Sequence, residues 1–96
     1  MSVRVYPADE GAEPYMLKVP EDDRLEFFQG LVNDLIEKVK LSTGETAYVG
    51  ENAGLKRNIP VNNNVSLSLE YGAQRILGTA VAFKGFDAKG DEILYK

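Results

Sequence analysis

The residues best suited to hold a ligand lie in a loop-like stretch at positions 50–64. Two adjacent bases, Lys56 and Arg57, are followed there by Asn58, and Gly54 frees nearby backbone N–H groups. Paired cations with backbone amides can cradle a phosphate, a nucleotide or another anion. The pattern matches neither a P-loop nor a dinucleotide-binding fingerprint. Because two bases are also common in a loop that is merely solvated, both interpretations stay open.

A run of three asparagines follows at positions 62–64. Amide side chains donate and accept hydrogen bonds, so the run could recognise a ligand or the backbone of a partner. Asparagine also tolerates left-handed backbone, which makes the same run typical of a tight turn. The candidate ligand-binding residues are therefore Lys56, Arg57, Asn58, Asn62, Asn63 and Asn64.

The densest acidic cluster, Glu21, Asp22 and Asp23, is the candidate surface for a partner protein. Residues 1–37 hold nine acids against three bases, a net charge of −6, whereas residues 38–96 hold six acids against eight bases, a net of +2. A negative front half could face a basic host protein or mimic nucleic acid. The alternative is a solvated surface that keeps a small protein soluble.

Groups for catalysis or metal binding are scarce. The chain has no cysteine and no histidine, which excludes thiol nucleophiles, histidine bases, disulfides and ordinary zinc sites. Asp87, Asp91 and Glu92 could ligate a hard cation around Gly90, but their spacing is not that of an EF-hand, and a hairpin turn accounts for them. We therefore expect a protein that is not an enzyme and has no cofactor and no metal.

Length and composition predict one soluble domain over residues 1–96. The chain is 44% apolar and 27% charged, as in ordinary globular proteins. It has neither an apolar run of about 18 residues nor a signal-peptide core, so we expect a cytoplasmic protein that does not enter a membrane. Its net charge of −4 argues against nucleic acid as a partner.

The elements that must position these residues begin with a hairpin and a helix. Alternating residues predict strands at 3–6 and 15–19. Asp22 and Asp23 are good N-cap residues, and Glu26 lies three beyond Asp23 as in a capping box. The helix that follows is predicted from an apolar stripe formed by Leu25, Phe28, Leu31, Val32, Leu35 and Ile36.

The rest of the chain is predicted to form mostly strands. A second hairpin is expected from residues 38–41 and 46–49. Residues 65–71 alternate like a strand, which we favour, although one or two helical turns would also fit. Residues 76–83 predict a central strand buried on both faces, and residues 92–95 predict a last strand.

Together these elements predict an α+β fold. It would hold a mostly antiparallel sheet of five to seven strands built from hairpins, with one amphipathic helix packed across one face. Edge strands such as residues 91–95 could pair two copies into a homodimer.

Four segments in this order also resemble a known family. They are Asp-Arg-Leu-Glu-Phe-Phe-Gln-Gly-Leu-Val (23–32), Gly-Leu-Lys-Arg-Asn-Ile-Pro-Val-Asn (54–62), Ile-Leu-Gly-Thr-Ala-Val-Ala-Phe (76–83) and Gly-Asp-Glu-Ile-Leu (90–94). The chain is similar to small proteins of unassigned function found mainly in phages, plasmids and the bacteria that carry them. The resemblance implies an accessory protein of a mobile element that acts by binding, for example to a host defence protein, with no catalytic residues to carry over.

Overall fold

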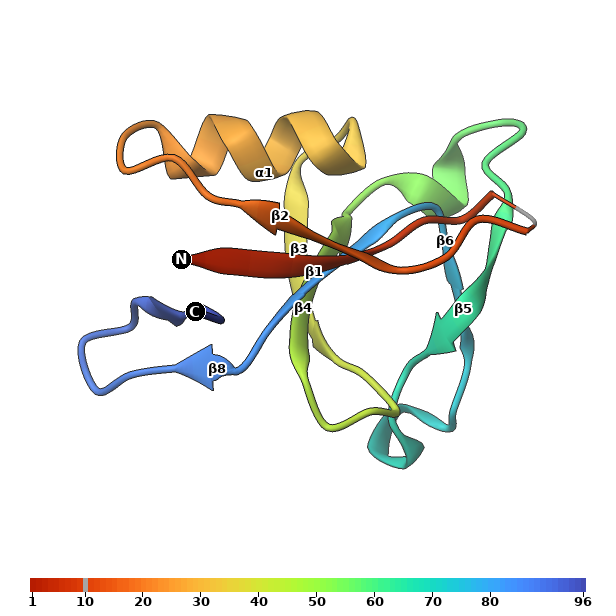
Figure 1. The fold of residues 1–96 in the computed structure, drawn as a ribbon. Coiled ribbons are helices and arrows are strands. Elements are labelled where there is room, and N and C mark those ends of the chain that lie inside the picture. Colours follow the sequence, from red (N-terminus) through yellow and green to blue (C-terminus); the bar gives the residue numbers. More distant parts are fainter. Residues whose placement is uncertain (10) are drawn as a thin grey trace.

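A five-stranded antiparallel sheet forms the centre of the protein in the computed structural model, which describes residues 1–9 and 11–96 (Figure 1). Its spatial order is β2-β1-β7-β4-β3. The five strands are β1 (Ser2–Tyr6), β2 (Tyr15–Lys18), β3 (Ile36–Lys40), β4 (Thr46–Gly50) and β7 (Ala80–Phe83). Both predicted hairpins are present, since β1 pairs with β2 and β3 with β4. The predicted α+β class is confirmed.

Shorter elements cover the two faces of this sheet. One helix, α1 (Arg24–Val32), packs on β3, β4 and β7, while the pair β5 (Val61–Ser66) and β6 (Arg75–Leu77) packs on the opposite face. The remaining elements are the 3₁₀ turns η1 (Ala53–Leu55) and η2 (Leu69–Tyr71) and the pair β8 (Gly85–Phe86) and β9 (Glu92–Ile93). Among the described residues, no helix is both long and apolar enough to cross a bilayer.

The central strand β7 shows how the two faces are filled. Its four residues are all buried, and alternate side chains point to opposite faces of a strand. Val81 and Phe83 join Phe28 of α1 in one core cluster, and Ala80 and Ala82 join the residues under β5 and β6 in the other. The prediction of a strand buried on both faces is therefore right for residues 80–83.

The predicted strand at 76–83 is nevertheless two strands. Gly78 has a φ of +83°, a left-handed conformation that side chains disfavour, and its N–H donates to the Pro60 carbonyl. The chain therefore leaves β6 in the covering layer and enters β7 in the central sheet.

The helix departs from prediction at both ends. Asp23 precedes it with a left-handed φ of 57° and no side-chain capping bond, so the predicted capping box is wrong. An N-cap needs extended backbone to aim its oxygen at the first helical N–H groups. At the other end Asn33 is also left-handed, which stops the helix at Val32 and lets Ile36 begin β3. Leu25 and Leu35, predicted on the buried stripe, are 58% and 54% exposed.

Two predicted boundaries between strand and loop are also wrong. The 50–64 stretch is not all irregular, because β5 already begins at Val61. The strand favoured for residues 65–71 ends at Ser66, and residues 69–71 form η2, as the alternative of a short helical turn predicted. Leu69 is 88% exposed, so the alternation there does not reflect burial.

Candidate functional site

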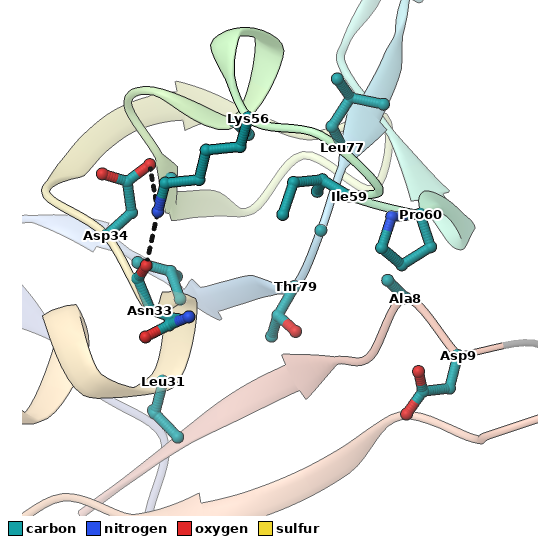
Figure 2. A pocket seen from close by; sticks show the side chains of 14 residues that line it. Ala8, Asp9, Leu31, Asn33, Asp34, Lys56, Ile59, Pro60, Leu77 and Thr79 are labelled. Carbon is teal, nitrogen blue, oxygen red and sulfur yellow. Dashed lines mark hydrogen bonds and ion pairs between the residues drawn. The ribbon is translucent and has the colours of Figure 1, made fainter.

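A cavity of about 190 Å³ lies where the end of α1 meets the loop between β4 and β5 and the turn between β6 and β7 (Figure 2). Its walls are mainly apolar and come from Ala8, Leu31, Val32, Ala53, Ile59, Pro60 and Leu77. Its polar side chains are Asp9, Asn33, Asp34, Lys56 and Thr79. A mostly apolar concavity with a few polar groups is the usual form of a small-molecule site.

Asp34 is the most buried charge at this cavity, with only 5% of its side chain exposed. Its Oδ1 accepts hydrogen bonds from the Leu35 N–H at 2.7 Å and from Asn52 Nδ2 at 3.1 Å. Its Oδ2 accepts one from the Asn52 N–H at 2.8 Å. Burial opposes ionisation, but these donors and a nearby ammonium outweigh it and hold the pKa of Asp34 below its usual value. The carboxyl group is therefore ionised at neutral pH.

Lys56 supplies that ammonium. Its Nζ lies 3.5 Å from Asp34 Oδ2 and donates a hydrogen bond of 2.8 Å to the Asn33 carbonyl at the end of α1. A cation is favoured there because the last carbonyls of a helix carry partial negative charge. Figure 2 shows the ammonium between these two oxygens, on the side of the cavity formed by α1. An ammonium has three protons and 39% of the Lys56 side chain is exposed, so at least one proton remains for a further acceptor.

Gly50 makes room for this ion pair. A Cβ atom at this position would lie 3.1 Å from Asp34 Oδ2 and 3.2 Å from Asp34 Cβ. Contacts this short would push the carboxylate away from the end of β4. The glycine thus has a steric role that neither turn chemistry nor composition reveals.

Of the six predicted ligand-binding residues, only Lys56 lines the cavity. Arg57 and Asn58 are exposed on the same loop, as the interpretation of a solvated loop predicts. The tight turn considered for the asparagine run 62–64 is wrong, because these residues lie in β5. Exposed Asn63 accepts a hydrogen bond of 3.3 Å from Arg75. Both bases of the loop are exposed, but only Lys56 borders the cavity.

The other two asparagines hold segments of the chain together. Asn62 is 1% exposed, and its Nδ2 donates to the carbonyls of Tyr6 and Gly78 at 2.8 and 2.9 Å. Asn64 donates to the carbonyls of Pro7 and Ala12 at 2.7 and 3.0 Å. Each amide nitrogen donates both of its protons to backbone carbonyls, so neither has a proton left for a ligand.

The acidic cluster lies in the turn that precedes α1. Glu21, Asp22 and Asp23 are all exposed, and within the described residues none of them forms an ion pair. Asp34, another acid of the front half, forms an ion pair with Lys56 at the edge of the cavity. Glu10 belongs to the same front half and lies outside the described residues.

A second buried carboxylate, Glu45, lies at the start of β4 with 9% of its side chain exposed. Its Oε1 accepts hydrogen bonds from the hydroxyls of Tyr6 and Thr43, and its Oε2 accepts one from Tyr95. Arg4 Nη1 lies 3.4 Å from Oε2. Burial opposes the charge here too, yet the three hydroxyls and the guanidinium outweigh it, and the pKa of Glu45 lies below its ordinary value.

The acidic residues around Gly90, which are candidates for a cation site, form hydrogen bonds and an ion pair within the protein. Asp87 Oδ1 accepts hydrogen bonds from the N–H groups of Lys89 and Asp91, which is a turn of the kind expected from Asp and Gly. Glu92 lies 2.5 Å from the Tyr48 hydroxyl and 3.6 Å from Arg24. In the part of the chain that the structure describes, no group of three or more acidic side chains is placed to hold a metal ion.

Sequence reasoning missed two residues of this site, Asp34 and Asn52. Asp34 was assigned to the helix, and its partner Asn52 lies 18 residues further along the chain. An asparagine next to an aspartate, as at positions 33 and 34, is the local signal for a helix end that was available. Compared with known proteins, the chain matches no family model, no curated protein and no solved structure.

Proposed function

We propose that this protein is a non-catalytic binding module and that its ligand site is the cavity beside Asp34 and Lys56. One observation carries the proposal: an oriented ammonium with a spare proton borders an otherwise mainly apolar cavity. Such a proton suits a carbonyl or carboxylate oxygen of a ligand whose body is apolar. The volume of about 190 Å³ is below the roughly 300 Å³ at which pockets for drug-sized ligands begin, so the ligand would be small.

Binding rather than turnover is favoured by the state of the carboxylate. Both oxygens of Asp34 already face donors, two at Oδ1 and two at Oδ2. A general base must accept a proton from the substrate, and a carboxylate whose lone pairs are occupied and whose pKa is lowered is poorly suited to that. Asp34 therefore acts in this proposal as the group that positions Lys56.

The test is a nuclear magnetic resonance titration with three matched probes: benzoate, benzamide and benzene. We expect benzoate and benzamide to shift the amide signals of Leu31, Ile59 and Leu77, with benzene binding more weakly because it offers no acceptor. Lys56→Met keeps an unbranched side chain but removes the ammonium group, and it should weaken benzamide binding about tenfold, as the loss of about 1.4 kcal/mol would. Equal affinity in Lys56→Met and the native protein would contradict the proposal.

Arg57→Met provides the matched control. Arg57 is adjacent, carries the same charge and is exposed like Lys56, but it does not line the cavity. Benzamide should bind this variant as it binds the native protein. If Arg57→Met weakened binding as much as Lys56→Met, the effect would come from the charge of the loop rather than from a donor at the cavity wall.

A second candidate function is the capture of a basic host protein by the acidic cluster. It is supported by three consecutive acids that are exposed and form no described ion pair. The resemblance to phage- and plasmid-borne proteins points to a bacterial host as the source of that partner. Attraction between charges at an exposed surface weakens with salt, which makes this candidate testable.

A pull-down from bacterial extract at low and high salt separates the two functions. Capture predicts one protein retained at low salt, released at high salt, and lost when Glu21, Asp22 and Asp23 are changed to Gln, Asn and Asn. The control changes three other exposed acids, Glu37, Glu51 and Glu70, to Gln. Retention that falls equally in both triple variants would show only a dependence on net charge.

A further inference from the structure

The two edges of the central sheet differ in what they would offer a second copy of the chain. β2 forms one edge and β3 the other (Figure 1). An edge strand presents unpaired N–H and C=O groups to which another strand can add. The residue at the centre of a two-fold pairing meets itself, and its neighbours on either side meet each other. Side chains brought opposite in this way therefore decide which edge can self-associate.

The β3 edge is protected against such pairing. A two-fold pairing centred on Lys38 places two lysines opposite each other, and one centred on Val39 places Lys38 opposite Lys40 of the second copy. Like charges directly opposite are destabilising. In addition, the Lys40 carbonyl already accepts a hydrogen bond of 2.9 Å from the Ser68 N–H.

The β2 edge has the opposite character. The Val19 N–H donates to the Met1 carbonyl at 2.9 Å, and the register continues from there along β1 and β2. Because hydrogen-bonded and non-hydrogen-bonded pairs alternate in an antiparallel ladder, Met16 and Lys18 direct their backbone groups away from the sheet. Tyr15 and Met16 are 48% and 45% exposed, so this edge carries apolar surface next to its free backbone groups.

We propose that two copies of the chain join through β2 in an antiparallel pair centred on Met16. Met16 then exchanges two backbone hydrogen bonds with Met16 of the second copy, and each Lys18 N–H donates to the Pro14 carbonyl of the other chain. Pro14 has no N–H to leave unpaired there. The two central sheets would continue into one of ten strands.

Side chains fit this register. Tyr15 lies opposite Leu17 of the second copy, so exposed apolar surface is covered from both sides. Lys18 lies opposite the uncharged Pro14 of the second copy, and Glu13 falls on the other face of the sheet, so this register opposes no like charges. α1 makes its main strand contacts with β4, β7 and β3 rather than with β2. A strand of four residues makes a small interface, so we expect a weak, micromolar dimer.

The first test uses the absence of cysteine from the chain. Opposed residues of a hydrogen-bonded antiparallel pair have Cα atoms about 5.5 Å apart, which is within the range for a disulfide. Met16→Cys should therefore form a covalent dimer under mild oxidation. Lys38→Cys on the other edge and Leu69→Cys on an exposed turn are the controls. If Met16→Cys is linked no faster than these two, the proposal is wrong.

The second test measures the equilibrium in the protein without cysteines. Sedimentation of the native protein over a concentration series should show a monomer–dimer equilibrium. Met16→Lys places two like charges opposite each other and should weaken the dimer at least tenfold, whereas Leu69→Lys should not change it. A native protein that stays monomeric at millimolar concentration would overturn the proposal, and neither test depends on the cavity.

Discussion

Asp34, which is partly buried, and Glu45, which is buried, are two carboxylates that keep their charge by different means. Asp34 is held by backbone and amide N–H groups and by an ammonium, and Glu45 by three hydroxyls and a guanidinium. Both pKa values are lowered. The difference lies in what surrounds them: Asp34 lines the cavity, whereas Glu45 does not and is bound by two tyrosine hydroxyls. We infer that Asp34 serves binding and Glu45 serves stability.

The largest expected effect is the loss of stability when Glu45 is removed. Glu45→Ala removes the common acceptor of three hydroxyls and should lower the free energy of unfolding by about 3 kcal/mol, measured by urea denaturation. Glu51→Ala, which changes an exposed glutamate close to the end of β4, should stay within about 0.5 kcal/mol of the native protein. Similar losses of unfolding free energy in the two variants would show that Glu45 stabilises the fold no more than an exposed glutamate does.

Alkaline pH tests the same cluster through its tyrosines. Burial and the bond to Glu45 raise the pKa of Tyr95 from 10.0 to about 12. Since the folded state binds this proton more tightly than the unfolded state, the stabilisation is complete below pH 10 and is lost as the pH rises toward 12. Tyr95→Phe should cost about 1 kcal/mol at neutral pH and show a smaller decline over that window. Denaturation at each pH, with tyrosinate absorbance to follow ionisation, measures both; an unchanged decline in Tyr95→Phe would contradict the assignment.

Gly50→Ala tests whether the space beside Asp34 is needed. The added methyl group would lie 3.1 Å from Asp34 Oδ2, so the carboxylate must move and some of its hydrogen bonds must lengthen. We expect a loss of about 1 kcal/mol in the free energy of unfolding, together with weaker benzamide binding. Gly54→Ala, where an added Cβ meets nothing within 4 Å, is the control. A Gly50→Ala variant that matched this control would mean that Asp34 has room to move.

The smallest expected effect is that of Asp34→Asn on ligand preference. The variant also loses some stability, because its amide nitrogen faces N–H groups that donate to the carboxylate in the native protein. It removes the charge that holds Lys56 in place, and the freed ammonium attracts anions but no longer presents an oriented proton. The ratio of benzoate to benzamide affinity should therefore rise about threefold in a titration, with less destabilisation than in Glu45→Ala. An unchanged ratio would show that Lys56 is positioned by the Asn33 carbonyl alone.

Much of the fold could be predicted because its signals are local. The hairpins at 3–6 with 15–19 and at 38–41 with 46–49 follow from alternation between neighbours, and the buried strand at 80–83 follows from an unbroken run of small and apolar residues. The end of the helix could not be predicted in the same way. Apolar spacing continues through Leu35 and Ile36, but the left-handed backbone of Asn33 overrides it.

The candidate site was predicted only in part, and for a related reason. Lys56 attracts attention as one of two adjacent bases, a pattern visible in the sequence. Nothing in the sequence shows that Asp34 contacts both Lys56 and Asn52. Nor does it show that the buried Asn62 amide donates to two backbone carbonyls. Residues of the same type therefore have different roles in the folded protein.

By itself, then, the sequence determines the class of fold, the two hairpins and the exclusion of cysteine and histidine chemistry, because these depend on residue types and on contacts between close neighbours. Only the tertiary structure decides which base borders a cavity, which carboxylates are buried and which sheet edge lacks opposed lysines. These features depend on pairs such as Asp34 with Asn52 and Glu45 with Tyr95, which lie 18 and 50 residues apart. Such pairs form when the layers of the fold come together and bury charges that must find partners.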